Sequence, residues 1–361
     1  MAQACDKKDG ANFTPQGKRE SVCKPGEFIV AACGLDHGHI GGMCNGLEEA
    51  GATIGYVYDH DPKKVETFIK NFPTAKPLSS QKELMERPDV NCVASAAIAS
   101  DRCAIGLDAL NHGKNYFSDK PPMTTMEQVK EARAKVKETG KRWFVYYAER
   151  LHVESAIYAG ELIKQGKIGE IVFIKGWGPH RTSLFSRPAW FFEKEKYGGI
   201  ITDIGSHQLE QVLYYSGAKD ARLISSRVGN LKHPEHPELE DYGDATYITD
   251  NGIPCYISVD WFTPDGLSTW GDGRMLISGT KGYIEIRKYV DVARDDTPDH
   301  VYLVDGEGEH RYDVHGQVGY PFFGEMILDC LHGTDTAMDQ EHIFRTIELA
   351  IEAEEKAVVI K

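Results

Sequence analysis

Residues 28–42, which read FIVAACGLDHGHIGG, decide the fold of this chain. The apolar run FIVAA, which begins at Phe28, is typical of a buried strand. A glycine-rich turn follows, and the next residues, IGGMCNGLEEAG, have the apolar spacing of a helix that ends at Gly51. A strand, a tight turn and a helix in this order predict the first strand–helix unit of a parallel sheet.

The same alternation continues as far as residue 148. Strands are expected at 53–59, 90–97, 115–119 and 142–148, and helices at 61–72, 79–87, 101–113 and 125–140. Strands and helices that alternate through short connections predict a doubly wound parallel sheet. We therefore expect an N-terminal α/β domain of the Rossmann type over residues 27–148, preceded by a polar tail at 1–26 that is either mobile or packed on a neighbour.

The pattern changes after residue 148. A helix at 153–166 and a strand at 170–178 precede segments of alternating polarity at 223–231, 244–250, 254–262, 273–279, 282–289 and 301–305. Asn251-Gly252 and Lys281-Gly282 are typical of hairpin turns. Residues 322–357 are expected to be mostly helical. We therefore expect residues 149–361 to form an α+β domain with a large, open and mostly antiparallel sheet.

Charge and composition narrow the class of protein. The net charge of −14 and the lack of a dense Lys/Arg block argue against nucleic acid and anionic membranes as partners. No apolar run reaches the ~18 residues of a membrane helix, and the polar N-terminus is not a secretory signal. The eight cysteines are scattered and form no C-x-x-C pair, which favours a reduced, cytoplasmic chain.

The glycine-rich turn fits a dinucleotide site. A pyrophosphate binds at a helix N-terminus, and an acidic residue roughly 20 residues further on holds the ribose hydroxyls. Asp59 stands at that point, and because its carboxylate would repel a 2′-phosphate, NAD is expected rather than NADP. Asp36 and His39 replace two glycines of the usual G-x-G-x-x-G pattern, so we expect side chains such as His37 or His39 to help hold the pyrophosphate. The predicted cofactor-binding residues are Gly34, Asp36, His37, Gly38, His39, Ile40, Asp59, Ala97 and Lys120.

The two histidines of the turn also suggest a metal site. Such a site needs three or four converging ligands, and His37 and His39 have no evident distant partners in the sequence. We therefore expect no metal at the turn. A metal held by Asp203, His207 and His180 stays open at this point.

Two further stretches carry groups suited to catalysis. In NYFSDKPPMTT, Lys120 follows a strand of the parallel sheet, and the carboxyl ends of such strands form the ligand crevice. In YGGIITDIGSHQLEQVLYYSG, Asp203 and His207 are four residues apart and share one helix face. An acidic residue that favours the helix dipole, beside a solvent-facing histidine, explains the same spacing equally well.

Together these stretches resemble the glucose–fructose oxidoreductase/inositol dehydrogenase (Gfo/Idh/MocA) family. The family has a glycine loop, an acidic residue after the second strand, an EKP-like tripeptide and a GGG…D-x-G-x-H helix. Here these read GLDHGHIGG at 34–42, Asp59, DKP at 119–121 and GGIITDIGSH at 198–207, in the same order. The resemblance covers roughly residues 27–357, with departures at Asp36, His39, Asp119 and Ile200.

The resemblance implies a function and roles for residues. Members mostly oxidise a secondary alcohol of a sugar or cyclitol with NAD(P), and a ring C3 hydroxyl of a glycoside is one specialisation. By resemblance, Lys120 lies between the nicotinamide and the substrate hydroxyl, and Asp203 and His207 face it from the second domain. It also implies a small carbohydrate or glycoside as substrate, and a homo-oligomer formed through the C-terminal sheet. The aromatic segment 176–192 is either a substrate loop, with His180, Arg181 and Trp190 as binding residues, or an interdomain or subunit contact.

Two other functions stay open on the sequence. A glycosidase of the same fold retains its NAD and oxidises the sugar only transiently, so NADH does not accumulate. A non-catalytic NAD-binding regulator is the other alternative, although the presence of Lys120, Asp203 and His207 argues against it.

Overall fold

The computed structural model describes residues 8–361. The chain forms two compact units. Unit 1 contains Ala11–Tyr146 and Tyr320–Phe344, and unit 2 contains residues 8–10, Tyr147–Gly319 and Arg345–Lys361. The units are therefore not continuous in sequence, in contrast to the expected ranges 27–148 and 149–361, because the chain returns to unit 1 at Tyr320 and passes back to unit 2 at Arg345.

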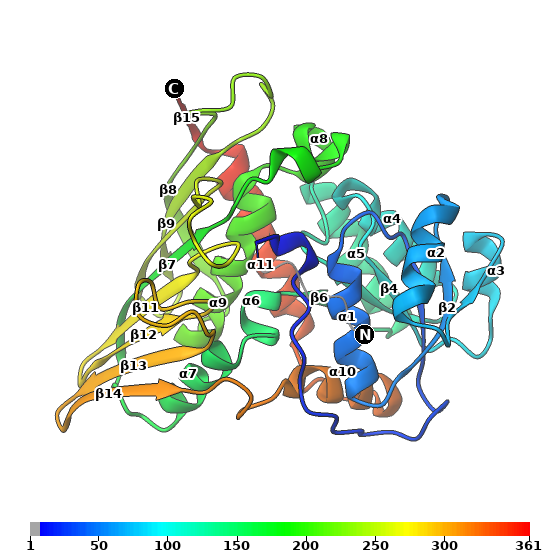
Figure 1. Cartoon of the computed structure of the whole chain (residues 1–361), viewed down its shortest axis with the longest axis horizontal. Coiled ribbons are helices and arrows are strands. Elements are labelled where there is room, and N and C mark those ends of the chain that lie inside the picture. The colour runs from blue at the N-terminus through cyan, green and yellow to red at the C-terminus, as the bar shows by residue number, and fades with distance from the viewer. Residues whose placement is uncertain (1–7) are drawn as a thin grey trace. The chain divides into compact units, whose positions relative to one another are not determined.

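Unit 1 is built on a six-stranded parallel sheet with the strand order β3-β2-β1-β4-β5-β6, which is the order of the dinucleotide-binding Rossmann fold (Figure 1). The expected doubly wound sheet is confirmed. The strands are β1 (Ile29–Cys33), β2 (Thr53–Tyr58), β3 (Lys76–Pro77), β4 (Cys92–Ser95), β5 (Asn115–Asp119) and β6 (Trp143–Tyr146). The two-residue strand β3 was not predicted, because it is too short to carry a pattern.

The helices of unit 1 explain why three of its strands are buried along their whole length. They are α1 (His39–Glu49), α2 (Pro62–Asn71), α3 (Gln81–Glu86), α4 (Ala99–Asn111), α5 (Met126–Thr139) and α10 (Pro321–His332). Every residue of β4, β5 and β6 is buried, as expected for parallel strands with both faces covered. A Cβ at Gly46 would lie 2.4 Å from the ring of Phe323, so glycine at this position lets α10 pack closely on α1.

The N-terminal arm, defined here as residues 11–23, packs on unit 1. Its backbone hydrogen-bonds to the end of α1, with Gly17 N donating to Glu49 Oε2 over 2.9 Å and Val22 N to the carbonyl of Ala50 over 2.9 Å. A Cβ at Gly38 would lie 2.3 Å from the carbonyl oxygen of Ala11. The sequence predicted a mobile tail or an arm on a neighbour for 1–26, whereas the arm covers the start of α1 in its own chain; residues 1–7 lie outside the described residues.

Unit 2 contains a nine-stranded sheet with the order β14-β13-β12-β11-β7-β10-β9-β8-β15. Its pairs are antiparallel except for β7 with β10 and β8 with β15, which confirms the mostly antiparallel sheet. The predicted turns at Asn251-Gly252 and Lys281-Gly282 join β9 to β10 and β11 to β12. The strands are β7 (Ile171–Pro179), β8 (Ala221–Gly229), β9 (Tyr242–Thr249), β10 (Pro254–Asp260), β11 (Arg274–Gly279), β12 (Tyr283–Arg287), β13 (His300–Asp305), β14 (Gly308–Asp313) and β15 (Val358–Ile360), of which β14 and β15 were not predicted.

One face of the second sheet is covered by helices (Figure 1). Tyr247 Oη in β9 and Ser226 Oγ in β8 donate to carbonyls of α11, at Leu349 over 3.0 Å and at Ala353 over 2.7 Å. The side chains of Trp177 and Tyr283 point to the other face and are 39% and 41% exposed. The remaining helices are α6 (Ala148–Leu151), α7 (Glu154–Lys164), α8 (Lys194–Tyr197), α9 (Ser206–Ser216) and α11 (Gln340–Glu355), the last of which begins in unit 1.

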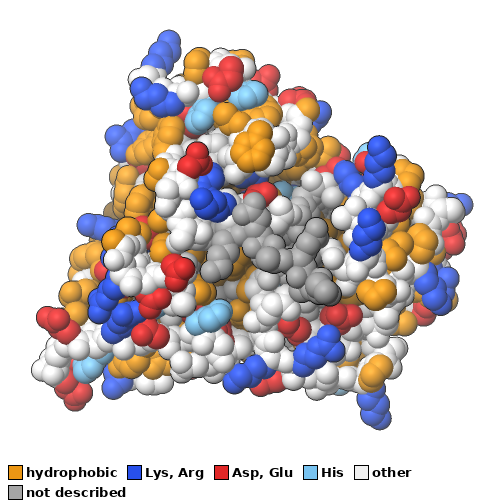
Figure 2. All heavy atoms as spheres, in the orientation of Figure 1, with side chains coloured by type: hydrophobic (Ala, Val, Ile, Leu, Met, Phe, Trp, Pro, Cys, Tyr) orange, Lys and Arg blue, Asp and Glu red, His pale blue; other side chains and the backbone are white. Residues whose placement is uncertain are grey.

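The surface carries both signs of charge. Figure 2 shows lysine and arginine side chains interspersed with aspartate and glutamate over the face in view. Among residues 8–361, no helix is both long enough and apolar enough to cross a membrane.

Candidate functional site

The glycine turn after β1 has the geometry of a dinucleotide loop. Gly34 has a φ of +79°, and a Cβ there would lie 2.6 Å from the Cβ of Ala97, so no other residue fits without strain. Gly34 N donates to the carbonyl of Tyr58, and Ala96 N donates to the carbonyl of Gly34, each over 3.1 Å. The turn is thereby fixed between the ends of β2 and β4.

The start of α1 presents donors for an anion. Within the described part of the chain, the backbone N–H groups of Asp36 and Gly38 have no hydrogen-bond acceptor. They precede a helix of 11 residues, whose N-terminus carries a partial positive charge. Unpaired N–H groups and a helix N-terminus are what a pyrophosphate binds. The residues present therefore fit a dinucleotide cofactor.

Asp59 lies where a ribose-binding acid is expected, directly after β2. Asp59 is 6% exposed, and its carboxylate accepts hydrogen bonds from Leu35 N over 2.6 Å and from Asp61 N over 2.8 Å. Lys64 Nζ lies 2.5 Å from Asp36 Oδ1 and 4.0 Å from Asp59 Oδ1. The structure thus brings two of the predicted cofactor residues, Asp36 and Asp59, together around one lysine.

The departures from the family motif at His39 and Asp119 are linked to each other. Asp119 Oδ1 lies 2.9 Å from His39 Nδ1, and Asp119 Oδ2 lies 3.0 Å from His37 Nδ1 and 3.1 Å from Arg102 Nη2. Burial opposes the ionised carboxylate, but His39, Arg102 and His37 hold the pKa of Asp119 well below its usual value. The histidines of the turn therefore connect the cofactor loop to the residue next to Lys120.

Two further observations concern the histidines of the turn. Burial, and then the charge of His39, lower the pKa of His37 to about 3, so this ring is neutral at pH 7 and supplies no positive charge to a phosphate. The sequence also showed no third metal ligand here, whereas His37, His39 and Asp119 place their ligand atoms within 4.8 Å of one another. The Arg102 guanidinium already lies against this carboxylate and supplies the cation it requires.

Arg102 is a residue that the sequence reasoning missed. It lies in α4, is 1% exposed, and donates from Nε to the carbonyl of Ala97 over 2.8 Å and from Nη1 to the carbonyl of Pro121 over 3.0 Å. Nη1 also donates to the carbonyl of Lys120. Arg102 therefore fixes the backbone carbonyls of Lys120 and of the residue that follows it, and Lys120 is 5% exposed. No local pattern separates this arginine from the solvated arginines that are usual on helices.

Asp203 and His207 lie on consecutive helical turns of unit 2. Asp203 is in a π-helical turn (Ile201–Gly205), and His207 is in the first turn of α9. Their exposed fractions are 9% and 3%. Single π turns inserted into helices are frequent at functional sites. The structure therefore contradicts a solvent-facing His207.

Two buried carboxylates hold the start of this helical segment. Ile200 N donates to Glu240 Oε2 and Ile201 N donates to Glu354 Oε2, each over 3.0 Å. Gly199 has a φ of +91°, and a Cβ there would lie 2.2 Å from Glu354 Cδ. The glycine in the motif is therefore required for both its backbone conformation and its room for Glu354.

A lysine neutralises part of the charge of this carboxylate pair. Lys194 Nζ lies 2.8 Å from Glu354 Oε1 and also contacts Glu240 Oε1. Burial, and then the charge of Glu240, raise the pKa of Glu354 to about 8. Because Glu240 and Glu354 are distant in sequence from Asp203, only the tertiary structure reveals that they support it.

The three predicted substrate residues have different environments. His180 Nδ1 lies 3.1 Å from the carbonyl oxygen of Gly178, and its ring centroid lies 4.5 Å from that of Trp270. The Arg181 guanidinium donates to the carbonyls of Pro264, Leu267 and Lys8, over 2.7, 3.2 and 3.2 Å. Trp190 is half-buried in a short 3₁₀ helix (Ala189–Phe192). Arg181 thus stabilises the loops around it, which reduces its capacity to bind a ligand.

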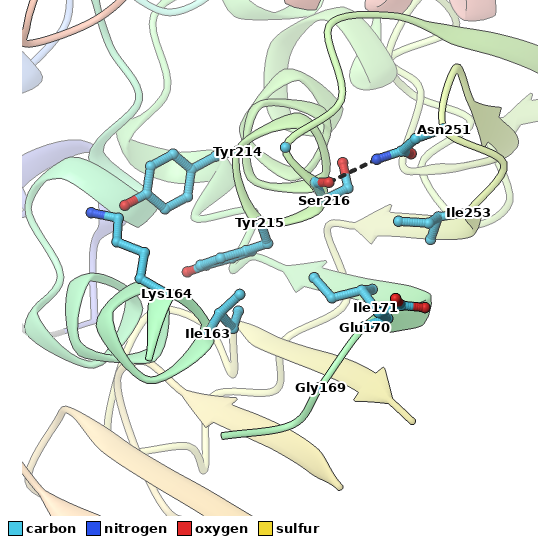
Figure 3. A pocket seen from close by; sticks show the side chains of 12 residues that line it. Ile163, Lys164, Gly169, Glu170, Ile171, Tyr214, Tyr215, Ser216, Asn251 and Ile253 are labelled. Carbon is cyan, nitrogen blue, oxygen red and sulfur yellow. Dashed lines mark hydrogen bonds between the residues drawn. The ribbon is translucent and has the colours of Figure 1, made fainter. Parts of the chain in front are cut away.

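The pocket in Figure 3 lies outside this set of residues. It has a volume of about 520 Å³ and is lined by residues of α7, α9, β7 and the turn between β9 and β10, among them Lys164, Tyr214 and Asn251. None of its lining residues is a predicted site residue. We therefore assign it no part in the proposed chemistry.

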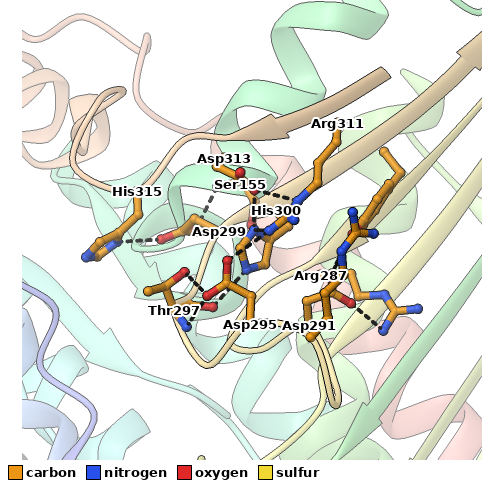
Figure 4. Close-up of polar contacts among 12 residues, drawn as sticks. Ser155, Arg287, Asp291, Asp295, Thr297, Asp299, His300, Arg311, Asp313 and His315 are labelled. Carbon is orange, nitrogen blue, oxygen red and sulfur yellow. Dashed lines mark hydrogen bonds and ion pairs between the residues drawn. The ribbon is translucent and has the colours of Figure 1, made fainter. Parts of the chain in front are cut away.

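A second group of possible metal ligands, Glu154, Asp299 and His315, lies near β13 and β14. Asp299 Oδ1 accepts from Ser155 N over 2.9 Å, and Asp299 Oδ2 lies 3.1 Å from His315 Nδ1 (Figure 4). Glu154 Oε1 accepts from Val318 N over 2.8 Å and from Gly319 N over 2.5 Å. These carboxylates stabilise the loop that follows β14. Asp203, His207 and His180 do not form such a ligand group among residues 8–361.

Comparison with family models identifies both halves of the chain. Residues 34–147 match a model described as "Oxidoreductase family, NAD-binding Rossmann fold", and residues 157–285 match "GFO/IDH/MocA C-terminal domain". The resemblance inferred from the motifs is confirmed. So is the prediction of an NAD-binding Rossmann domain.

Individual relatives support the same assignment. A putative oxidoreductase from Erwinia carotovora atroseptica is 45% identical and superposes with a TM-score of 0.91 over 93% of this chain and 100% of that chain. The scyllo-inositol 2-dehydrogenase (NAD(+)) of Bacillus subtilis is 29% identical over 241 residues, which are 65% of this chain and 66% of that protein. Levoglucosan dehydrogenase in complex with NADH and L-sorbose shares the fold, with a TM-score of 0.76 at 16% identity over 92% of this chain and 98% of that one. The match to the Bacillus enzyme thus spans just under two thirds of that curated relative.

Proposed function

Because the chain belongs to the GFO/IDH/MocA family, we propose that it is an NAD-dependent oxidoreductase that oxidises a secondary hydroxyl of a sugar, cyclitol or glycoside. The observation that carries this proposal is the buried His207 of unit 2, which lies in the first turn of α9, directly after the π turn that carries Asp203. Buried polar side chains are costly, so a fold retains them where they have a task. The Bacillus relative named as an inositol dehydrogenase supports the cyclitol or sugar class.

The chemistry assigns a role to each group. NAD supplies a hydride acceptor for the carbinol carbon. The proton of the substrate hydroxyl must leave in the same reaction, and an imidazole is a suitable general base near neutral pH. His207 is proposed to accept that proton, and Asp203 to orient the hydroxyl or the imidazole. Lys120 is proposed to donate a hydrogen bond to the substrate oxygen as negative charge develops on it.

Cofactor binding is assigned to the loop of unit 1. The free N–H groups of Asp36 and Gly38 are proposed to bind the pyrophosphate, with Gly34 and Ala97 permitting the close turn. The Asp59 carboxylate is proposed to hold the adenosine ribose. Together with Asp36 it outweighs the single charge of Lys64, so we expect a preference for NAD over NADP.

Substrate binding is assigned to two residues of unit 2. His180 and Trp190 offer a ring nitrogen and an aromatic face, which suit sugar hydroxyls and C–H groups. The ring C3 hydroxyl of a glycoside remains one candidate for the reacting group.

The open face of the second sheet is a candidate surface for self-association. Alternate residues of β7 and β12 leave Trp177 and Tyr283 exposed there. Exposed aromatic residues on a sheet favour contact with another protein surface. We propose a homo-oligomer formed through this face, which light scattering of wild type and Trp177→Lys tests. A wild-type monomer would refute it.

The test of the proposed function is a panel of polyols, aldoses and glycosides incubated with NAD. We expect one class to yield NADH and a product lighter by two hydrogens, measured by absorbance and mass spectrometry. Cleavage of a glycoside without accumulation of NADH would instead support a glycosidase that retains its cofactor. NAD binding without turnover of any compound would support a regulator.

A further inference from the structure

A buried ion pair joins α6 to the segment after β12 inside unit 2. Lys288 Nζ lies 2.6 Å from Glu149 Oε2. Lys288 is 0% exposed and Glu149 is 2% exposed. Taking two charges out of water is unfavourable, and only their mutual attraction and further hydrogen bonds offset that cost. Neither residue has a place in the proposed reaction so far, so the pair needs an explanation.

The pair is connected to the residue next to His207. Gln208 Nε2 donates to Glu149 Oε2 over 2.7 Å. The Gln208 side chain lies against β7, where a Cβ at Gly176 or Gly178 would lie 2.6 Å from its Oε1 or 2.7 Å from its Nε2. The two glycines of the GWG sequence therefore allow Gln208 to reach Glu149. This contact fixes the first turn of α9 relative to the carboxylate.

The two carboxylate oxygens of Glu149 differ in their hydrogen bonds. Lys288 and Gln208 both bind Oε2, and within the described chain Oε1 is buried without a hydrogen-bond partner. Burial opposes ionisation, but Lys288, followed by His207 and His180, lowers the pKa of Glu149 to about 2. The carboxylate is therefore negative at neutral pH, and its charge acts on His207.

We propose that Glu149 is a positioning residue for His207. The negative charge of the Glu149 carboxylate stabilises the imidazolium that forms when His207 takes the substrate proton. This inference rests on the proposed function. In the reaction the hydroxyl proton moves to the imidazole, the C–H electron pair leaves as hydride to NAD, and the alcohol becomes a ketone. Lys288 and Gln208 fix the carboxylate, so that it neither rotates away nor takes up the proton itself.

Other charged or titratable groups belong to the same unit as His207. Tyr147, which precedes α6, has its ring centroid 6.1 Å from that of His207. His180 follows β7, Lys288 follows β12, and Asp203 lies in the preceding π turn. The positive charge of Lys288 opposes an imidazolium, whereas the carboxylates of Asp203 and Glu149 favour one. Of the two carboxylates, Asp203 belongs to the Asp/His motif of the family and Glu149 does not.

The test measures the pKa of His207 directly. The full-length protein is labelled with ¹³C-histidine, the His207 signal is assigned by its loss in His207→Ala, and its shift is followed against pH in wild type and Glu149→Gln. Removing the neighbouring negative charge is expected to lower the pKa of His207 by about one unit or more. The plateau of kcat/KM against pH is expected to fall about tenfold, because a weaker base accepts the proton less readily.

Glu210→Gln is the matched control. It removes another buried carboxylate of α9, whose partner is Arg150 at 2.7 Å, and is expected to lower stability while leaving the pKa of His207 in place. An unchanged His207 pKa in folded Glu149→Gln, or an equal shift in both variants, would overturn the inference. If the wild type oxidises no alcohol, the proposed function fails, whereas the titration still decides the effect of Glu149 on His207.

Discussion

Replacing Gly199 with alanine tests the claim that Glu354 supports the segment that carries Asp203 and His207. Gly199 has a φ of +91°, and the new Cβ would lie 2.2 Å from Glu354 Cδ. The carboxylate must therefore move, and the hydrogen bond from Ile201 N to Glu354 Oε2 is lost. Gly217 is a matched control at the other end of α9, with a φ of +66° and no atom within 4 Å of a Cβ.

The two variants differ by one physical effect. An alanine in the left-handed region costs roughly 1–2 kcal/mol, and both variants bear this cost. Leaving the buried Ile201 N–H without its acceptor costs about 1–3 kcal/mol more, in Gly199→Ala alone. We therefore expect Gly199→Ala to lower the free energy of unfolding by about 2–5 kcal/mol.

Urea unfolding, monitored by tryptophan fluorescence, measures this difference, and steady-state kinetics with NAD measure its effect on turnover. We expect kcat to fall in Gly199→Ala and to stay near wild type in Gly217→Ala, because only the first substitution displaces the turn that carries Asp203. Equal urea midpoints for the two variants would show that Glu354 does not support this segment.

Three further predictions concern Gly38, Asp59 and Glu354. Gly38→Ala is expected to release the N-terminal arm to limited proteolysis, because its Cβ would lie 2.3 Å from the Ala11 oxygen, whereas Gly41→Ala, with its nearest atom at 3.6 Å, is expected to resist like wild type. Asp59→Ala is expected to raise kcat/KM with NADP relative to NAD by about tenfold, since one repelling charge is gone; an unchanged ratio would remove Asp59 from cofactor choice. Because the pKa of Glu354 is raised to about 8 in the folded protein, the protonated group contributes stability that is fully present below about pH 5 and is lost as the pH rises through 8. The melting temperature is therefore expected to fall with pH over this range in wild type, and this part of the fall is expected to be absent in Glu354→Gln.

The sequence predicted features that depend on neighbours along the chain. The apolar runs of β1 and β4 and the turn at Asn251-Gly252 are local patterns, and they appear where expected. Gly34 was predictable for the same reason, because the tight turn at the end of the first strand requires it. The order of the motifs then identified the family.

The supporting residues could not be predicted in this way. Arg102, Glu149 and Glu354 act on segments between 18 and 153 residues away, through hydrogen bonds that no periodicity encodes. Gly38 was predicted only as a cofactor-binding residue, and no pattern in the sequence indicates that the carbonyl of Ala11 in the N-terminal arm lies against it. Local patterns therefore specify the elements and the motif residues, and tertiary contacts specify what positions them.

The central claim is that His207 takes a proton from a carbohydrate hydroxyl while NAD takes the hydride. It is tested most directly by comparing NADH formation by wild type and His207→Ala on the best compound of the polyol and glycoside panel, at equal occupancy by NAD. We expect the variant to bind NAD as wild type does and to lose about 10²–10⁴-fold in kcat, the usual effect of removing a general base. Near-normal kcat in His207→Ala would contradict the account.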